Sequence, residues 1–256
     1  MSLTADIILA LRLADAAADA IRPWFRGNAR VERKQDFSPV TAADRAAEAV
    51  MRRIIERDRP SDGIIGEEYG IVPSRSGRLW VLDPIDGTRG FVAGRQLYGT
   101  LIALLENDKP ILGIIDSGAA GDRWVGQVSG QIGTTLNGKP VRSRKCESLQ
   151  QAHAATTAPH MFSASGHAAF QRIGRSVGDM LLGGDCHNYG LLAAGCLDLV
   201  MEEGLKVYDW AALVPVIEGA GGIITDWRGA ALGLKSEGRV LAAGDRAVHA
   251  EALQRI

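Results

Sequence analysis

The chain has 256 residues, of which 46% are hydrophobic and 23% charged, and its formal net charge at pH 7 is −1. The length allows one large domain or two closely packed halves, and the composition is typical of a globular protein. The balanced charge excludes a strongly basic surface, so we expect neither nucleic acid nor a membrane as a partner. Three cysteines without a CxxC pair predict no disulfide framework, and the lack of a secretory signal or a long apolar run predicts a cytoplasmic location.

The first predicted element is an amphipathic helix. Apolar residues recur at helical spacing from residue 3 to about residue 27, where a glycine favours the end of the helix. Residues 30–35 are charged and are expected to be extended. Residues 34–40 are expected to form a loop, because the residue before Pro39 is disfavoured in a helix.

A second helix is predicted to begin after Thr41 and to run to about Asp58. Thr41 suits the N-cap, and Asp44 stands three residues later, where an acid can accept a hydrogen bond from the backbone of the cap. Asp44 therefore has a structural interpretation as half of a capping box. That role is compatible with a second, functional one.

Acidic residues follow a short apolar segment that is predicted to be a strand. Residues 64–66 form this segment, and Glu67 and Glu68 come directly after it. Taken alone, these two acids fit a solvated loop better than a site. Residues 71–78 contain serines, glycine and proline and are expected to be a loop leading to the next strand.

The next strand, at residues 79–82, is expected to end at Asp83 and Pro84, because proline cannot donate to a sheet ladder. Asp83 and Asp86 then fall on the predicted turn, with Gly87 to make it and Thr88 to open a helix. One such aspartate would need no functional explanation. Two carboxylates beside free backbone N–H groups suit a hard cation and a phosphate together, provided that the chain supplies matching acids elsewhere.

An antiparallel meander is predicted after a short helix or loop at residues 89–96. Residues 100–105 and 111–115 are apolar and are joined by a hairpin signal around Asn107 and Asp108. Residues 123–128 are expected to form a third strand, and Asn137-Gly138 marks another tight turn.

A polar segment near residues 142–150 suggests a boundary, so we expect an N-terminal half at 1–145 and a C-terminal half at 146–256. Beyond it, strand and helix signals alternate, which favours crossover connections and a partly parallel sheet. Strands are expected at 152–156, 180–183, 197–201, 223–225 and 240–243. Helices are expected at 164–176, 189–195, 209–221 and from 245 onward.

Asp209 lies at the start of one of these helices, where an acid is also a good cap. With it, five acids stand at the ends of predicted elements: Asp44, Glu67, Asp83, Asp86 and Asp209.

Four segments together resemble the inositol monophosphatase superfamily. Residues 80–88 match the first family signature, residues 209–222 match the second, and residues 34–44 and 66–68 complete the set. Tyr208 stands where many members have tryptophan, a change that should not affect the metals. The resemblance spans about residues 34–226. It implies a layered α+β fold, the αβαβα sandwich shared by inositol monophosphatases and fructose-1,6-bisphosphatases.

The resemblance also implies a magnesium-dependent, lithium-sensitive phosphatase. All of the implied metal ligands are oxygen donors, which Mg²⁺ prefers. They would hold two or three Mg²⁺ ions, and they are Glu67, Asp83, the carbonyl of Ile85, Asp86 and Asp209.

The remaining implied roles concern the water and the phosphate. Asp44 and Thr88 would position and deprotonate the attacking water, and Glu68 would order water at the metal. The backbone N–H groups of Gly87 and Thr88 would hold the phosphate. Attack is expected to be direct, by water, because no residue is presented as a nucleophile.

Several local stretches resemble the histidinol-phosphate phosphatase branch, at residues 86–94, 113–124, 183–195 and 202–209. Histidinol carries an ammonium and an imidazole, so its pocket should present acids. Asp185 and Glu202 are the candidates, together with Asp209, and Glu202 stands where the family contacts substrate. The structural alternatives are a turn residue for Asp185 and a solvated strand end for Glu202.

The expected reaction is therefore hydrolysis of L-histidinol phosphate to histidinol and phosphate, a step of histidine biosynthesis. Members of the family commonly form dimers, so the resemblance also implies a homodimer. One alternative is inositol monophosphate, or another small phosphate ester, as the substrate. Another is a catalytically silent Mg²⁺-binding regulator on the same fold. The five histidines show no HExxH spacing, so zinc chemistry is not expected and most of them should be surface or packing residues.

Overall fold

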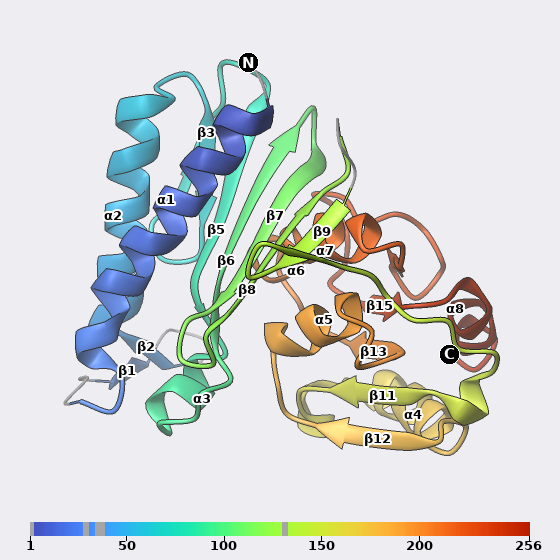
Figure 1. Ribbon diagram of the computed structural model, residues 1–256. Helices are drawn as coiled ribbons and strands as arrows, with labels where there is room; N and C mark the ends of the chain where they lie inside the picture. The colour runs from blue at the N-terminus through green and yellow to red at the C-terminus, as the bar shows by residue number, and fades with distance from the viewer. Residues whose placement is uncertain (1–2, 28–30, 34–38, 130–132) are drawn as a thin grey trace.

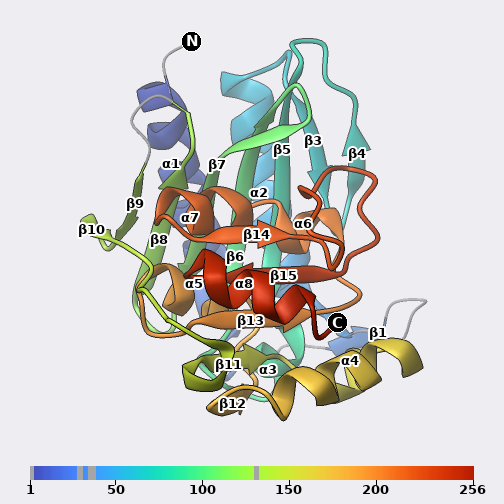
Figure 2. The ribbon, with the colours of Figure 1, turned by 90° about the vertical axis from the view of Figure 1, so that its right-hand side faces the viewer.

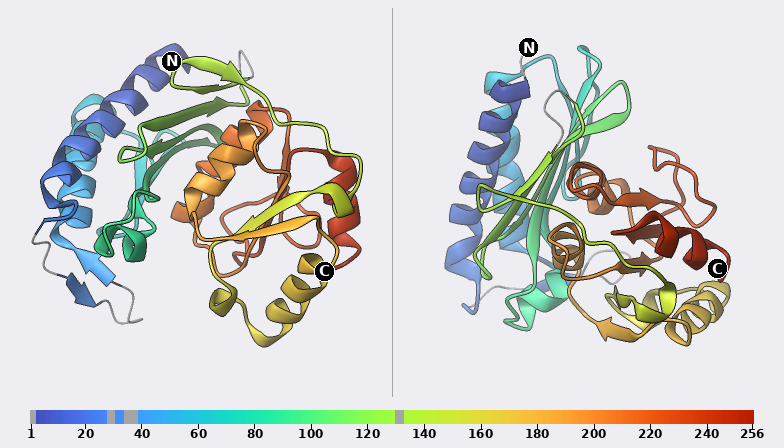
Figure 3. Two further views of the ribbon diagram at one scale, coloured as in Figure 1. Left: turned by 60° about the horizontal axis from the view of Figure 1, so that its bottom comes forward. Right: turned by 45° about the vertical axis from the view of Figure 1, so that its right-hand side comes forward.

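Two β-sheets and three layers of helices alternate across the molecule (Figures 1 and 3). The computed structural model describes residues 3–27, 31–33, 39–129 and 133–256. Helices α1 and α2 cover one face of the larger sheet, and α5, α6 and α7 lie between the two sheets. Figure 2 looks onto the smaller sheet from the side that α4 and α8 cover. This order of layers confirms the predicted αβαβα sandwich.

The helices have the following bounds: α1 Leu3–Ile21, α2 Ala42–Asp58, α3 Thr88–Val92, α4 Ala164–Gly174, α5 Cys186–Ala193, α6 Val207–Trp210, α7 Leu213–Gly219 and α8 Arg246–Leu253. Three 3₁₀ turns accompany them: η1 Arg22–Trp24, η2 Leu149–Gln151 and η3 Pro159–Met161. The α1 helix ends before residue 27, because Pro23 has no N–H for a helical bond and the chain tightens into η1.

Helix α2 begins as predicted. Thr41 Oγ1 accepts a hydrogen bond from the N–H of Ala43 at 3.1 Å, and Asp44 Oδ2 accepts one from the N–H of Thr41 at 2.8 Å. Both partners of the capping box are buried. The segment before this helix contributes a two-stranded ribbon, β1 (Val31–Arg33) and β2 (Pro39–Thr41). The loop expected at 34–40 is wrong for residues 39 and 40, which belong to β2, and residues 34–38 lie outside the described part of the chain.

The larger sheet has the strand order β10-β9-β8-β7-β6-β5-β3-β4. Its strands are β3 Gly63–Gly66, β4 Gly70–Val72, β5 Arg78–Asp86, β6 Gly99–Glu106, β7 Lys109–Ser117, β8 Asp122–Gln127, β9 Gly133–Leu136 and β10 Lys139–Val141. Strands β5 to β10 form the predicted antiparallel meander, whereas β3 and β5 are parallel. The expected loop at 71–78 is partly wrong, since its first residues complete the edge strand β4.

The smaller sheet has the order β12-β11-β13-β15-β14 and is partly parallel, as predicted. Its strands are β11 His153–Thr156, β12 Asp179–Leu182, β13 Leu199–Glu202, β14 Ile223–Thr225 and β15 Val240–Ala243. The predicted helix at 209–221 is instead two short helices, α6 and α7. Pro215 explains the break, because its ring would clash with the carbonyl of Ala211 in a continuous helix.

Glycines in the larger sheet let α7 approach its backbone closely. A Cβ atom at Gly113 would lie 2.1 Å from the carbonyl oxygen of Ala212, and one at Gly126 would lie 2.3 Å from Cα of Val216. One buried apolar cluster therefore includes residues of both sheets and of the helices between them. In the described part of the chain, no helix is both long and apolar enough to cross a bilayer. The division at 145/146 remains a prediction.

Substitution of Gly113 by alanine should destabilise the protein, because the added methyl group would force α7 away from β7. Overpacking of this kind costs about 1–3 kcal/mol. We expect a melting temperature several degrees below that of the wild type. Gly118→Ala is the control, since a Cβ there meets nothing within 4 Å. Equal melting temperatures for the two variants would contradict this packing.

Candidate active site

A bulge in β5 turns two carboxylates to the same side of the sheet. The strand runs through to Asp86 and does not end at Pro84, as the sequence had suggested. Its pairing with β6 moves from Asp83 opposite Leu101 to Asp86 opposite Gly99, so two residues of β5 stand opposite one of β6. Positions three apart in a regular strand face opposite sides, and the extra residue brings them to the same side.

Three aspartates meet at this bulge. Carboxylate oxygens of Asp83, Asp86 and Asp209 lie within 4.8 Å of one another. Glu67 joins them through the sheet register, because Gly66 pairs with Leu82 in parallel β3 and β5, which places residue 67 beside residue 83. The structure thus brings together the four acidic side chains that the sequence named as metal ligands.

Burial and mutual repulsion raise the pKa values of these acids. Burial is the largest cause for each aspartate, and it raises the pKa of Asp86 and of Asp209 to about 7. The pKa of Asp83 lies well above its usual value, raised by burial and then by the charge of Glu67. The ionised cluster is therefore costly without a cation.

The donor set at the cluster fits a hard divalent cation. All the side-chain donors are carboxylate oxygens. The carbonyl of Ile85 accepts a hydrogen bond from Thr88 Oγ1 at 2.8 Å, which leaves its second lone pair for another partner.

Backbone donors from the C-terminal half hold two of the aspartates. The N–H of Cys186, at the start of α5, donates to Asp86 Oδ2 at 2.7 Å. The N–H of Lys206 donates to Asp209 Oδ2 at 2.6 Å. Asp209 is therefore at the third position of α6 and not at its cap, as had been expected. The contribution of Cys186 was missed, because a backbone donor gives no side-chain signal in the sequence.

Asp44 and Thr88 lie at the border of the cluster. Asp44 Oδ2 is engaged by Thr41, and Asp44 Oδ1 is 3.5 Å from Thr88 Oγ1. Burial raises the pKa of Asp44, and the charge of Glu67 raises it further. Gly87, at φ +79°, is the N-cap of α3, so Thr88 does not cap this helix as predicted. Its hydroxyl bonds back to the bulge instead.

Asp185 and Glu202 extend the acidic surroundings. Asp185 has a φ of 47°, and burial and the charge of Asp86 raise its pKa to about 7, while Arg95 and Arg89 oppose this rise. A Cβ on Gly87 would lie 3.0 Å from Cγ of Asp185, so the two residues are in close contact.

Glu202 is only 4% exposed, so a solvated strand end is the wrong description. Its Oε1 accepts hydrogen bonds from the N–H of Thr157 at 2.8 Å and from Thr157 Oγ1 at 2.7 Å. Burial raises the pKa of Glu202 to about 7, and the charge of Asp185 adds to this rise. The two candidate recognition acids are thus close enough to interact.

Glu67 and Glu68 are half-buried, so they do not form the solvated loop that they suggested when taken alone. The backbone N–H of Glu68 donates to the buried carboxylate of Glu48 at 2.6 Å. No local pattern in the sequence singled out Glu48.

Tyr189 is another residue that the sequence did not single out. It is buried in α5, and its hydroxyl has no hydrogen-bond partner among the described residues. Burial raises its pKa strongly, and the charges of Glu202, Asp86 and Asp209 add to that rise. The hydroxyl is therefore a buried donor near the acids, without a partner among the described residues.

None of the five histidines belongs to the aspartate cluster. His153 and His160 are exposed, and His167 is half-buried. His187 and His249 are buried and contact the hydroxyls of Ser117 and Thr225.

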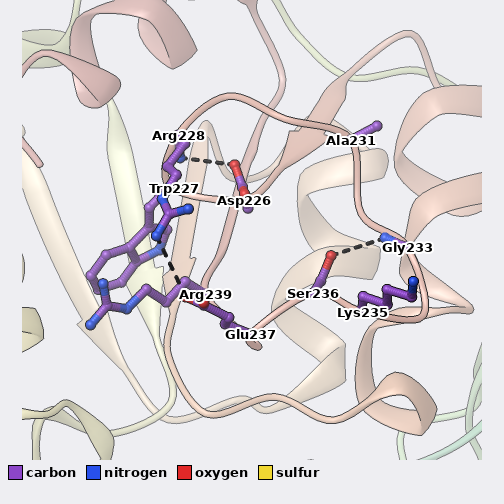
Figure 4. Close-up of a pocket in the computed structure, with 9 residues that line it drawn as sticks. All are labelled: Asp226, Trp227, Arg228, Ala231, Gly233, Lys235, Ser236, Glu237 and Arg239. Carbon is purple, nitrogen blue, oxygen red and sulfur yellow. Dashed lines mark hydrogen bonds and ion pairs between the residues drawn. The ribbon is translucent and has the colours of Figure 1, made fainter.

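A surface pocket of about 320 Å³ lies in the loop between β14 and β15 (Figure 4). Its walls carry Arg228, Lys235 and Arg239, but also Asp226 and Glu237. The guanidinium of Arg239 is engaged by Glu203 at 2.9 Å. None of the clustered aspartates lines this pocket or the second cavity of about 260 Å³ beside α1, so neither is the acidic site.

Known proteins are similar to this chain in sequence and in fold. The bifunctional phosphatase IMPL2 of Arabidopsis thaliana is 47% identical over 94% of this chain and 72% of its own length. A histidinol-phosphatase of Mycobacterium tuberculosis is 36% identical over 88% of this chain and 89% of its own. The structure of an inositol monophosphatase from Zymomonas mobilis has a TM-score of 0.91 and 51% identity, and the match covers 100% of this chain and 98% of that one.

A model of the inositol monophosphatase family matches residues 3–256. The fold, the layer order and these relatives agree with the resemblance seen in the sequence. The chain belongs to the inositol monophosphatase family and is a phosphoric monoester hydrolase.

Proposed function

We propose that this phosphatase hydrolyses L-histidinol phosphate in a Mg²⁺-dependent reaction, as a cytoplasmic homodimer. The observation that carries the proposal is the pair of interacting acids beside the aspartate cluster, half-buried Asp185 and buried Glu202. An ammonium or imidazolium group of a substrate would lower the cost of keeping both acids ionised. The name of the Mycobacterium tuberculosis relative supports the same substrate.

In this proposal the metal ligands are Glu67, Asp83, the carbonyl of Ile85, Asp86 and Asp209, which would hold two or three Mg²⁺ ions. Bound there, Mg²⁺ supplies Lewis-acid stabilisation of the charge that develops on the phosphate. Asp86 and Asp209 are held in place by backbone N–H groups, which orients them before any ligand arrives.

The attacking water would be handled by Asp44 and Thr88. The Thr88 hydroxyl, which donates to the carbonyl of Ile85 in the structure, would turn to donate to Asp44 Oδ1, 3.5 Å away, and would accept a hydrogen bond from the water. The raised pKa of Asp44 makes its carboxylate a stronger base than that of an exposed aspartate. Glu68 would order neighbouring water, and the N–H groups of Gly87 and Thr88 would bind phosphate oxygens.

Inositol monophosphate is the second candidate substrate. The name of the Zymomonas mobilis protein favours it, and Arg89 and Arg95 near Asp185 partly offset the acidity of the pocket. A side-by-side measurement of kcat/KM for histidinol phosphate and inositol 1-phosphate, with phosphate release as readout, separates the two. Against the catalytically silent regulator, IMPL2 and the Mycobacterium tuberculosis relative are named phosphatases, and the chain keeps both Asp44 and Thr88.

Asp86→Asn should abolish nearly all activity while the fold is retained. The asparagine can still accept from the N–H of Cys186, but it removes one charge from the cluster. We expect kcat/KM to fall at least about 100-fold and the melting temperature in EDTA to be maintained. Phosphate release and thermal melts check this, with Asp108→Asn in an exposed turn as control. Full turnover by Asp86→Asn would remove the metal role of this residue.

Glu202→Ala should raise KM for histidinol phosphate more than KM for a small phosphate ester whose alcohol part is uncharged. The reason is that only the first substrate carries a cation that Glu202 can attract. Steady-state kinetics with both esters provides the measurement, and Glu237→Ala, at an exposed ion pair, is the control. Equal effects on both esters would count against recognition by Glu202.

The pH dependence of stability should reveal the acidic cluster. Four acids have folded-state pKa values of about 7, above the values they have in the unfolded chain: Asp86, Asp185, Glu202 and Asp209. At pH values between the unfolded and the folded pKa, the folded protein therefore binds more protons than the unfolded chain. The free energy of unfolding contributed by these groups should therefore fall as the pH rises from about 4 to about 7. Protons compete with Mg²⁺, so Mg²⁺ should raise the melting temperature more at pH 8 than at pH 5.5. Melts in EDTA and in Mg²⁺ test this, and a pH-independent Mg²⁺ effect would contradict it.

A further inference from the structure

We infer that Glu48, with Arg52, is a positioning residue that fixes the Glu67–Glu68 turn so that Glu67 faces the aspartates. This inference rests on the proposed function, because it assigns Glu67 to the metal site. Glu48 lies on α2, one helical turn after Asp44, and it is completely buried. It touches none of the reacting groups, so any effect on the reaction must act through the turn.

The carboxylate of Glu48 accepts three hydrogen bonds. Its Oε2 accepts from the N–H of Glu68 at 2.6 Å, and its Oε1 accepts from the N–H of Tyr69 at 3.1 Å and from Nε of Arg52 at 2.7 Å. Each of these bonds involves an ionised acceptor, which makes it stronger than a bond between neutral groups. A single buried side chain thus determines the path of two consecutive peptide units.

Arg52 closes the other side of the turn. It stands four residues after Glu48 on the same face of α2, and its terminal nitrogen donates to the carbonyl of Gly70 at 2.5 Å. The Glu48–Arg52 pair therefore binds two N–H groups and one carbonyl between the end of β3 and the start of β4. This satisfies backbone groups that the sheet ladder leaves unpaired.

Gly66 is the residue that allows this approach. A Cβ atom there would lie 1.9 Å from Glu48 Oε1 and 2.7 Å from a terminal nitrogen of Arg52. The last residue of β3 therefore has to lack a side chain for the carboxylate to reach the turn. Glycine is needed here for space.

The clamped turn determines where Glu67 points. The N–H of Glu67 donates to the carbonyl of Leu82 at 3.2 Å, which anchors it on the β5 side, and Glu48 anchors the next residue on the α2 side. Glu67 is held between these two anchors. From there its charge raises the pKa values of Asp83, Asp209 and Asp44.

Glu48 could have a purely structural role or a positioning role. The Mg²⁺ affinity of the folded protein distinguishes these two roles. A structural role alone would lower the melting temperature in EDTA and leave the Mg²⁺ affinity of the folded protein unchanged. A positioning role weakens Mg²⁺ binding itself, because Glu67 is no longer held for the metal. Loss of a group that orients a metal ligand typically costs about 10–100-fold in affinity.

The test variant is Glu48→Gln, which keeps the volume but puts an NH₂ group against a backbone N–H or Arg52. Its control is Glu56→Gln, an exposed position on the same helix. Calorimetric titration of each full-length protein with Mg²⁺, well below its melting temperature, should give a dissociation constant about tenfold higher or more for Glu48→Gln and an unchanged one for Glu56→Gln. KM for the phosphate ester at saturating Mg²⁺ should change little.

A folded Glu48→Gln that binds Mg²⁺ as tightly as the wild type would overturn the inference while leaving the proposed function intact. If Glu48→Gln does not fold, Arg52→Lys takes its place. It keeps the positive charge but loses the guanidinium that spans Glu48 and Gly70, and an unchanged Mg²⁺ affinity for it would likewise overturn the inference. A wild-type protein that binds no Mg²⁺ would refute the proposed metal site and, with it, this role of Glu48.

Discussion

Mutual repulsion among buried carboxylates is the constraint on which the rest of this structure depends. Asp83, Asp86 and Asp209 place oxygens within 4.8 Å of one another, and Glu67 adds its charge. Such a cluster opposes folding unless protons or a cation neutralise it and unless the surrounding backbone is rigid enough to hold it. The raised pKa values of Asp86 and Asp209 mean that these carboxylates bind protons more readily than exposed aspartates do. The same arrangement gives a divalent cation an oxygen-lined place to bind.

Rigid backbone from both halves of the chain supplies the restraint. The β5 bulge comes from the larger sheet, whereas the N–H groups of Cys186 and Lys206 come from the helices between the sheets. Those helices can lie close to the sheet because glycines at 113 and 126 leave room for their backbone. Packing far from the acids is therefore coupled to their geometry. A change at the α7–β7 contact is expected to shift the position of Asp209, since α6 and α7 are joined by only two residues.

Asp185, which we propose as a substrate-recognition residue, has a strained backbone. Asp185 adopts a φ of 47°, which costs energy for a residue with a side chain, and it sits at the tight turn before α5. Strain of this kind persists where the surroundings hold it, and here the close contact with Gly87 does so. Relatives with the same fold are named for different phosphate esters. Variation at such turn positions is a simple way to change the ester without disturbing the metal ligands.

The sequence by itself determined the family, the layered fold, most elements and the acids of the site, because apolar periodicity, proline, glycine and short acidic motifs are local signals. It placed α2 correctly from Thr41 and Asp44, and the meander from its apolar segments and turn signals. Only the tertiary structure showed that β5 continues through Pro84 as a bulge, that Pro215 divides one helix into α6 and α7, and that Glu202 is buried. It also revealed the backbone donors at Cys186 and Lys206 and the clamp made by Glu48. These features depend on strand register and on contacts between residues far apart in the chain, and neither is written in any local pattern of side chains.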